Sequence, residues 1–231
     1  TIFDQIYDAC RRMDISVVGG HSEITYGLDR PVAVGALIGE VDYDRLVSPR
    51  GAQPGDRLLL TKGVPVEATA VIGHEMSDQL SSAFSAADLA RARDFLRDPG
   101  IRVLAEARAA TGAGRVTAMH DPTEGGLITA LWELAEASGR TLVFEPDAVP
   151  VPELSRRLCG HLGIDPLASI ASGALLLSVA AEDADQVGGA VEAAGIRCRE
   201  IGRVEAGEPA VFRQGAQGRE AIPLPERDEI A

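Results

Sequence analysis

The stretch of the chain with the most chemical potential reads His120-Asp121-Pro122-Thr123-Glu124-Gly125-Gly126-Leu127. A capped helix explains part of it, because Asp121 can cap a helix, Pro122 suits its first position and Glu124 completes a capping box. The Gly125-Gly126 pair needs another reason, because a glycine inside a helix costs about 1 kcal/mol relative to alanine. Helix stability alone therefore does not account for this stretch.

Glycines at a helix start let a ligand or another backbone approach its free N–H groups, where the helix dipole favours phosphate. The carboxylates of Asp121 and Glu124 would repel that phosphate. A Mg²⁺ ion between them removes the conflict, because Mg²⁺ takes one or two protein carboxylates together with phosphate oxygens. Two interpretations stay open at this point: a metal-phosphate site, and a capped helix that packs closely against a neighbour.

A second candidate is Gly19-Gly20-His21-Ser22-Glu23, which follows a short apolar run. Paired glycines followed by histidine, serine and an acid can present a backbone nest and polar side chains to a phosphate or a metal. A tight turn with a hydrogen-bonded His21 is the alternative, and the segment taken alone favours the turn.

Two further segments lie beside expected strands. Thr61-Lys62-Gly63 leads toward an expected helix, a usual place for ligand contacts in α/β layers, but it lacks P-loop spacing. Lys62 is the single lysine among 22 basic residues, and we interpret it as a solvated surface side chain. Ala171-Ser172-Gly173-Ala174 is interpreted as a turn. His74 and His161 have no partners at metal-ligand spacing, which indicates surface or core histidines.

These candidates must be positioned by the elements around them. Apolar residues at three- and four-residue spacings predict a helix with one buried face over 1–14. β-type apolar runs predict strands at 15–18 and, mostly buried, at 31–41. The polar connection 42–56 contains prolines and glycines and predicts a domain boundary, which we place between residues 50 and 51.

Beyond that boundary the expected strands and helices are mixed. The strands are expected at 57–60, 115–119, 141–144, 174–180, 196–204 and 209–213, and the helices at 65–75, 87–97, 100–111, 121–138, 152–162 and 182–194. A serine-rich loop at 76–86 and an extended polar end at 214–231 complete the chain. This mixture predicts an α+β, or two-layer α/β, fold.

The composition excludes several classes of protein. Acidic residues outnumber basic ones 35 to 22 in 231 residues, and the net charge of −13 repels a nucleic-acid backbone. No apolar run reaches the ~20 residues of a membrane helix, and no signal peptide is visible, which predicts a cytoplasmic protein without membrane contact. Cys10, Cys159 and Cys198 form no C-x-x-C pair, so we expect buried free thiols.

Taken in order, the motifs resemble those of the aminoimidazole ribonucleotide (AIR) synthetase, or PurM-like, superfamily, and within it the HypE-like, AIR synthase-related branch. Gly19–Glu23, Thr61–Gly63 and Asp121–Leu127 belong to this pattern. The other matching segments are Gly55-Asp56, Ala135-Glu136-Ala137-Ser138-Gly139, Cys159–Leu167 and Ile201-Gly202-Arg203-Val204.

The resemblance implies a two-domain subunit that pairs into a homodimer and holds ATP and Mg²⁺ in a cleft. Residues 1–50 would be the end of the N-terminal ATP-binding and dimerisation domain, and residues 51–231 a complete C-terminal domain. Asp121 matches a magnesium- and phosphate-binding aspartate. Thr123, Glu124 and Gly125 lie in the same phosphate loop, and Gly19, Gly20 and His21 match a second ATP-binding segment. The resemblance assigns no catalytic residue.

Two departures from the family pattern bear on function. The family's glycine-rich segment with paired aspartates is expected upstream of Thr1, inside a longer protein. HypE proteins end in a cysteine that carries a carbamoyl group, whereas this chain reads Pro225-Glu226-Arg227-Asp228-Glu229-Ile230-Ala231 at its end. The resemblance implies an enzyme for hydrogenase-maturation-type chemistry, which phosphorylates an amide or carboxylate oxygen of a small molecule or protein tail. A non-catalytic dimerising or accessory protein is the alternative.

Overall fold

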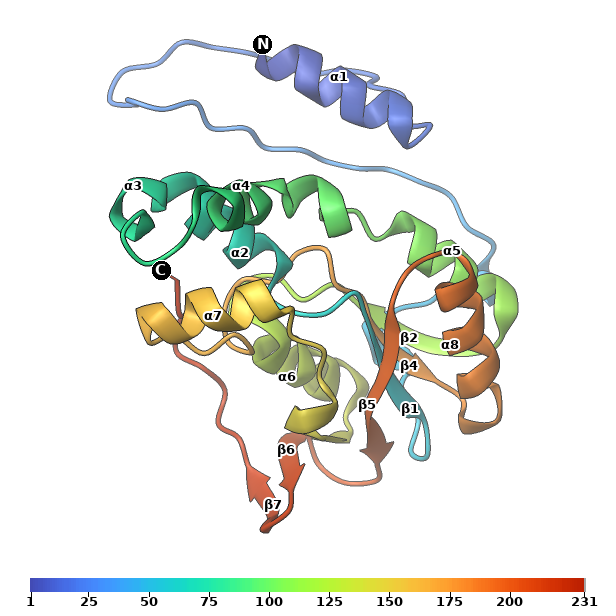
Figure 1. The fold of residues 1–231 in the computed structure, drawn as a ribbon. Helices are drawn as coiled ribbons and strands as arrows, with labels where there is room; N and C mark the ends of the chain where they lie inside the picture. The colour runs from blue at the N-terminus through green and yellow to red at the C-terminus, as the bar shows by residue number, and fades with distance from the viewer. Residues whose placement is uncertain (231) are drawn as a thin grey trace. The chain divides into compact units, whose positions relative to one another are not determined.

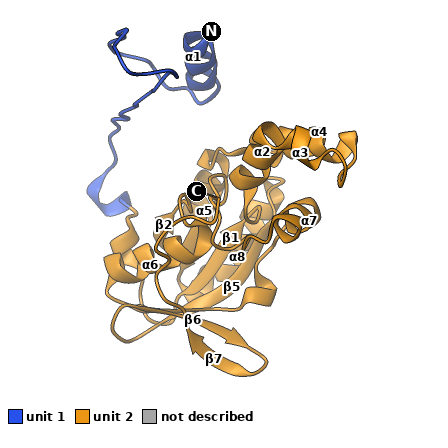
Figure 2. Cartoon of the chain, turned by 90° about the vertical axis from the view of Figure 1, so that its left-hand side faces the viewer, with its two compact units in different colours: residues 1–46 blue, residues 47–231 orange. Residues whose placement is uncertain are grey.

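The computed structural model describes residues 1–230 and divides the chain into two compact units, Thr1–Leu46 and Val47–Ala231 (Figure 2). The division falls within the polar connection expected at 42–56. The assignment of residues 1–50 and 51–231 to particular domains of the family stays a prediction.

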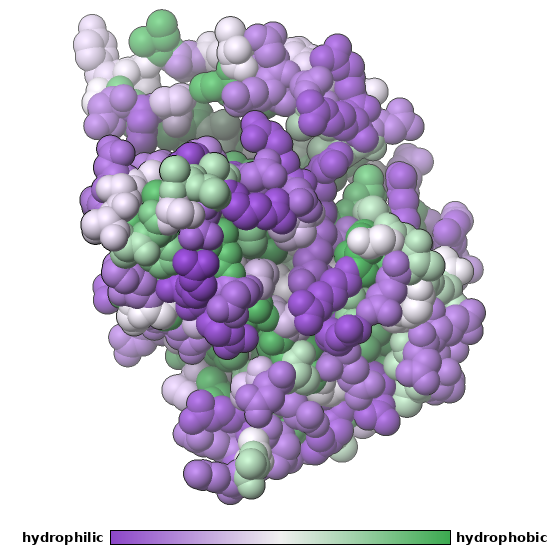
Figure 3. Space-filling view, viewed as in Figure 1, coloured by the Kyte–Doolittle hydropathy of each residue, from purple (hydrophilic) through white to green (hydrophobic). Residues whose placement is uncertain are grey.

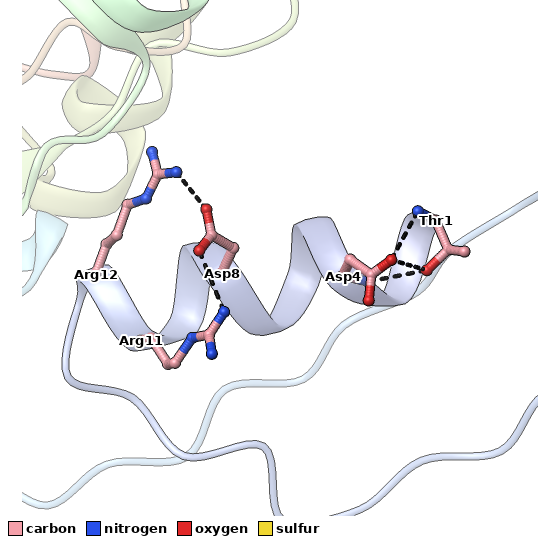
Figure 4. Close-up of polar contacts among 5 residues, drawn as sticks. All are labelled: Thr1, Asp4, Asp8, Arg11 and Arg12. Atoms are coloured by element: carbon pink, nitrogen blue, oxygen red, sulfur yellow. Dashed lines mark hydrogen bonds and ion pairs between the residues drawn. The ribbon is translucent and has the colours of Figure 1, made fainter.

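The first unit contains one helix, α1 (Ile2–Arg12), at the place where periodicity predicts it. The buried face predicted for it is wrong for this structure, because none of its residues is buried within the described chain. A capping box fixes its start: the Asp4 backbone N–H donates to the Thr1 hydroxyl at 3.2 Å, and the Thr1 backbone nitrogen donates to the Asp4 carboxylate at 2.9 Å (Figure 4). At the other end, Asp8 pairs with Arg11 and Arg12, whose charges complement the helix dipole.

The strands predicted at 15–18 and 31–41 are wrong for this structure, which has no regular element at either place. The 3-10 turn η1 (Tyr43–Arg45) is the other regular piece among residues 1–46. Val18 and Val34 are 94% exposed, and Figure 3 shows hydrophobic residues among hydrophilic ones at the surface of this unit. A strand needs a neighbour for its N–H and C=O groups, and residues 1–46 offer none.

The second unit is built on one seven-stranded sheet in the order β2-β4-β1-β5-β3-β6-β7 (Figure 1). Neighbouring strands run antiparallel, except for the parallel pair β3 and β6. The strands are β1 (Arg57–Thr61), β2 (Val116–His120), β3 (Thr141–Phe144), β4 (Leu176–Val179), β5 (Cys198–Glu205), β6 (Ala210–Gly215) and β7 (Gly218–Ala221).

Helices lie on both faces of this sheet (Figure 1). They are α2 (Val66–Glu75), α3 (Ser77–Leu80), α4 (Ala86–Asp94), α5 (Leu104–Ala113), α6 (Gly126–Ser138), α7 (Glu153–Leu162) and α8 (Ala184–Ala193). Short helical segments lie in the connections between elements: η2 (Pro49–Gly51), η3 (Leu96–Gly100), η4 (Pro146–Ala148) and η5 (Ala181–Asp183). The α+β fold class is therefore confirmed.

The apolar run in β1 shows how the sheet is buried. Leu58 and Leu60 pack into the core beneath α6, whereas Leu59 packs with Val187 and Val191 of α8 on the opposite face. Successive side chains of a strand point to opposite faces, so three consecutive leucines are the mark of a strand covered on both sides.

The expected elements beyond residue 56 are mostly confirmed, with three differences. The predicted loop 76–86 contains the single-turn helix α3, and the helix predicted from residue 121 begins at Gly126. The end predicted as extended contains β7, which pairs with β6 through a turn that places Gly218 at φ +116°. All residues of β7 are exposed, so its sequence has no apolar alternation from which the strand could be predicted.

The thiol prediction holds for Cys159 and Cys198, which are free and buried, at 1% and 4% exposure, while Cys10 is half-buried. Burial raises the pKa of each buried thiol to about 11. None of the helices within residues 1–230 combines the length and apolar character needed to cross a membrane.

At pH 8 we expect N-ethylmaleimide to label Cys10 and to leave Cys159 and Cys198 unmodified, because only about 0.1% of a thiol with a pKa near 11 is thiolate. Peptide mass spectrometry before and after unfolding in guanidinium measures which of the three cysteines are labelled. Rapid labelling of either buried thiol in the folded protein would contradict this burial.

Candidate functional site

Three of the predicted segments meet at one edge of the sheet. His120 at the end of β2 and Leu60 near the end of β1 both pair with Leu176 at the start of β4. The loops after β1 and β2 and the loop before β4 therefore lie at the same edge. Hydrogen bonds join them, because Leu175 N donates to Thr61 Oγ1 at 2.9 Å and Ala171 N donates to the Thr123 carbonyl at 3.3 Å.

The capping box predicted for Asp121–Glu124 is wrong, because α6 begins at Gly126. Gly125 and Gly126 have φ values of +70° and +59°, in the left-handed region that side-chain-bearing residues rarely adopt. A right-handed helix cannot run through them, so Asp121, Pro122 and Glu124 form a loop ahead of α6.

Close packing explains the glycine pair, against another backbone for Gly126 and against the Thr129 side chain for Gly125. A Cβ on Gly126 would lie 2.5 Å from the Ser169 carbonyl oxygen and 2.7 Å from the Leu167 carbonyl oxygen, and a Cβ on Gly125 would overlap the Thr129 hydroxyl. This is one of the two interpretations that the residues left open. Two backbone N–H groups in the first turn of α6 already have acceptors within the chain. Gly126 N donates to the Thr123 carbonyl at 3.0 Å, and Ile128 N donates to the Leu167 carbonyl at 3.1 Å.

The loop before α6 nevertheless carries two unpaired carboxylates and a backbone N–H that binds an anionic group. Asp121 and Glu124 are exposed, and within residues 1–230 neither carboxylate has a hydrogen-bond or ion-pair partner. The buried Gly125 N–H donates to the Asp228 carboxylate at 2.5 Å. An amide that binds a carboxylate oxygen has the chemistry to bind a phosphate oxygen.

The carboxylates of Asp121 and Glu124 fit Mg²⁺ better than they fit a metal ion that takes most of its ligands from protein side chains. Among the described residues, no three histidine, cysteine, aspartate or glutamate side chains come together as a metal-binding group. Mg²⁺ needs only one or two carboxylates when phosphate oxygens and water complete its shell. Asp121, with Glu124 beside it in the loop, meets that requirement.

His120 has a partner that the sequence does not reveal. Its Nε2 lies 2.6 Å from a carboxylate oxygen of Glu133, which projects from α6, thirteen residues further along the chain. The pair ties the start of the loop to the helix that follows it. Only the packing of α6 against the end of β2 brings the two side chains together, so no sequence signal identifies the pair.

The interpretation of Lys62 as a solvated surface side chain is wrong. Its side chain is 7% exposed and its Nζ lies 2.8 Å from Glu106 of α5, which is 1% exposed. It also donates to the carbonyls of Gly100 at 3.1 Å and Arg102 at 2.5 Å. The φ of +56° at Lys62 turns the chain sharply after β1, under the segment that leads into α5.

The predicted turn at 171–174 is present, and Gly173 adopts φ +110°. A Cβ there would lie 2.8 Å from the Gly100 carbonyl oxygen, so this turn packs on the same segment that Lys62 holds. The other histidines behave as surface or core residues: His74 is exposed, and the His161 ring packs edge-on against Phe84 with centroids 5.5 Å apart.

Gly19, Gly20 and His21 belong to the first unit, where a Cβ on either glycine would meet no atom within 4 Å. The His21 ring nitrogen lies 3.7 Å from the Glu23 carboxylate, and both side chains are exposed. Their part in an ATP site stays a prediction.

Comparison with known proteins supports the resemblance. A putative hydrogenase expression/formation protein of Methanocaldococcus jannaschii is 26% identical over 80% of this chain and 52% of its own length. The carbamoyl dehydratase HypE of Cupriavidus necator is 29% identical over 88% of this chain and 56% of its own length. The chain thus spans about half the length of the curated relatives it matches.

The fold has known neighbours as well. The crystal structure of a hydrogenase maturation protein HypE in complex with ATP superposes with a TM-score of 0.60 at 24% identity, over 84% of this chain and 58% of the other. The family described as AIR synthase related protein, C-terminal domain, matches residues 53–213, which include the whole sheet apart from β7 and the end of β6. The chain therefore belongs to the AIR synthase related protein family, through its C-terminal domain.

Proposed function

We propose that this chain is part of an ATP- and Mg²⁺-dependent enzyme that phosphorylates an oxygen of an amide, carboxylate or similar group. The observation that carries the proposal is the loop before α6, where the unpaired Asp121 and Glu124 carboxylates precede an amide, Gly125 N–H, that already binds an anion. The carbamoyl dehydratases among its relatives and the ATP complex of a structural neighbour support it.

In this proposal Asp121 holds Mg²⁺, and Thr123, Glu124 and Gly125 form the phosphate loop around it. Gly19, Gly20 and His21 are further ATP- or phosphate-binding residues in this proposal. Mg²⁺ would neutralise charge on the transferred phosphoryl group, while the loop fixes its position. The acceptor is a small molecule or a protein tail, and the working protein is a cytoplasmic homodimer.

Magnesium dependence tests the proposal. In calorimetric titrations of the full-length protein we expect ATP with Mg²⁺ to bind at least about tenfold more tightly than ATP in EDTA, because free triphosphate meets two unpaired carboxylates. Equal affinities with and without Mg²⁺ would remove the metal from the site. Absence of binding in both titrations would remove the ATP-dependent function.

A second candidate, a non-catalytic dimerising or accessory protein on the same scaffold, is favoured by one observation. The amides of Gly126 and Ile128 at the start of α6 already donate to carbonyls of the chain, which leaves this helix end fewer groups for phosphate than a free one. That candidate predicts a dimer in solution that fails to bind ATP in either titration.

A further inference from the structure

The end of the described chain returns to the loop before α6. Trp132 Nε1 donates to the Ile222 carbonyl at 3.0 Å, Glu229 N donates to the Ala168 carbonyl at 3.2 Å, and Gly125 N donates to Asp228 at 2.5 Å. Residues 222–230 therefore follow α6 back toward its start. Figure 1 shows this segment in red, between β7 and the C-terminus.

The segment, which we call the closing segment (residues 222–230), is anchored on both sides of Asp228. One Asp228 oxygen accepts from Gly125 N–H, and the other accepts from the backbone N–H of Ile230 at 2.9 Å. Ile230 is half-buried and packs against the cluster that contains Phe84 and Leu158. The Asp228 carboxylate is thus held in place by a turn and an apolar anchor.

Asp228 contacts a loop that carries acidic residues of its own. Asp121 and Glu124 are unpaired carboxylates of the same loop, and Glu226 and Glu229 add negative charge within the closing segment. The N–H of Gly125 gives Asp228 a charge-assisted hydrogen bond. The same N–H cannot serve a phosphate oxygen while Asp228 occupies it.

We infer that Asp228 is an internal competitor, which closes the phosphate position of the loop with its own carboxylate until a phosphate-bearing ligand displaces the closing segment. The inference rests on the proposed function and adds regulation of the same site. Apparent affinity for the ligand falls in proportion to the fraction of molecules in the open state. Removing the competing carboxylate therefore raises the affinity without adding any contact to the ligand.

The test compares Asp228→Ala with Glu226→Ala in the full-length protein. Glu226 is an exposed acid of the same segment, so its substitution removes the same charge and leaves the Gly125 contact intact. We expect ATP with Mg²⁺ to bind Asp228→Ala about tenfold more tightly than the parent, which corresponds to a closed form favoured by about 1.4 kcal/mol. Glu226→Ala should bind as the parent does.

Hydrogen exchange of the peptide that contains Gly125 gives a second readout. Exchange should be faster in Asp228→Ala than in the parent, and added ATP with Mg²⁺ should speed exchange of residues 222–230 in the parent. If Asp228→Ala binds ATP no more tightly than the parent, and the parent still binds ATP, then Asp228 only stabilises the loop. That result would overturn the competitor role of Asp228 and leave the proposed function standing. Absence of binding by the parent and both variants would overturn the proposed function together with it.

Discussion

Lys62→Ala should lower the free energy of unfolding by about 3–5 kcal/mol, the cost of leaving a buried charge without its partner. Glu106 is 1% exposed, and Lys62 Nζ at 2.8 Å is its ion-pair partner. The substitution also deprives the Gly100 and Arg102 carbonyls of their donor. A typical domain has a total free energy of unfolding of ~5–15 kcal/mol, so this loss would remove a large part of the stability.

Urea unfolding followed by circular dichroism measures the effect, with two matched variants. The double variant Lys62→Met/Glu106→Gln removes both charges at similar volume and should recover most of the loss. Arg57→Ala breaks an exposed pair with Glu200 of comparable length, 2.9 Å, and should cost less than about 1 kcal/mol. A Lys62→Ala variant no less stable than Arg57→Ala would contradict the buried-pair account.

Local sequence signals suffice where an element carries its own pattern. The three leucines of β1 and the Thr141–Phe144 strand encode burial that their own residues reveal. The spacing in α1 predicts the helix but not its burial, because none of its residues is buried. The apolar run at 31–41 carries an equally strong signal, yet it forms no strand. A strand depends on a partner, and a local pattern does not say whether that partner is present.

Sequence reasoning fails where distant parts of the chain meet. Lys62 and Glu106 lie on different elements, as do His120 and Glu133, and only the fold makes each a pair. Asp228 reaches Gly125 across 103 positions. The residue types of 120–127 identify the motif. They do not show that Gly125 and Gly126 adopt left-handed backbone and pack closely, because the same residues also fit the start of a helix.

In the proposed function, the loop before α6 binds Mg²⁺ and ATP through Asp121. The Asp121 side chain is exposed and unpaired within residues 1–230, so its removal should leave the fold and the stability nearly unchanged. Its effect should fall on binding. A contact to a charged group is worth up to ~3 kcal/mol, which corresponds to about a hundredfold in affinity.

The most direct measurement is a calorimetric titration of ATP with Mg²⁺ into the full-length protein, Asp121→Ala and Asp147→Ala. Asp147 is an exposed aspartate of η4, and its removal changes the net charge by the same amount. We predict about a hundredfold loss of affinity for Asp121→Ala and parent affinity for Asp147→Ala. An Asp121→Ala variant that binds ATP as tightly as the parent in Mg²⁺ would contradict the claim.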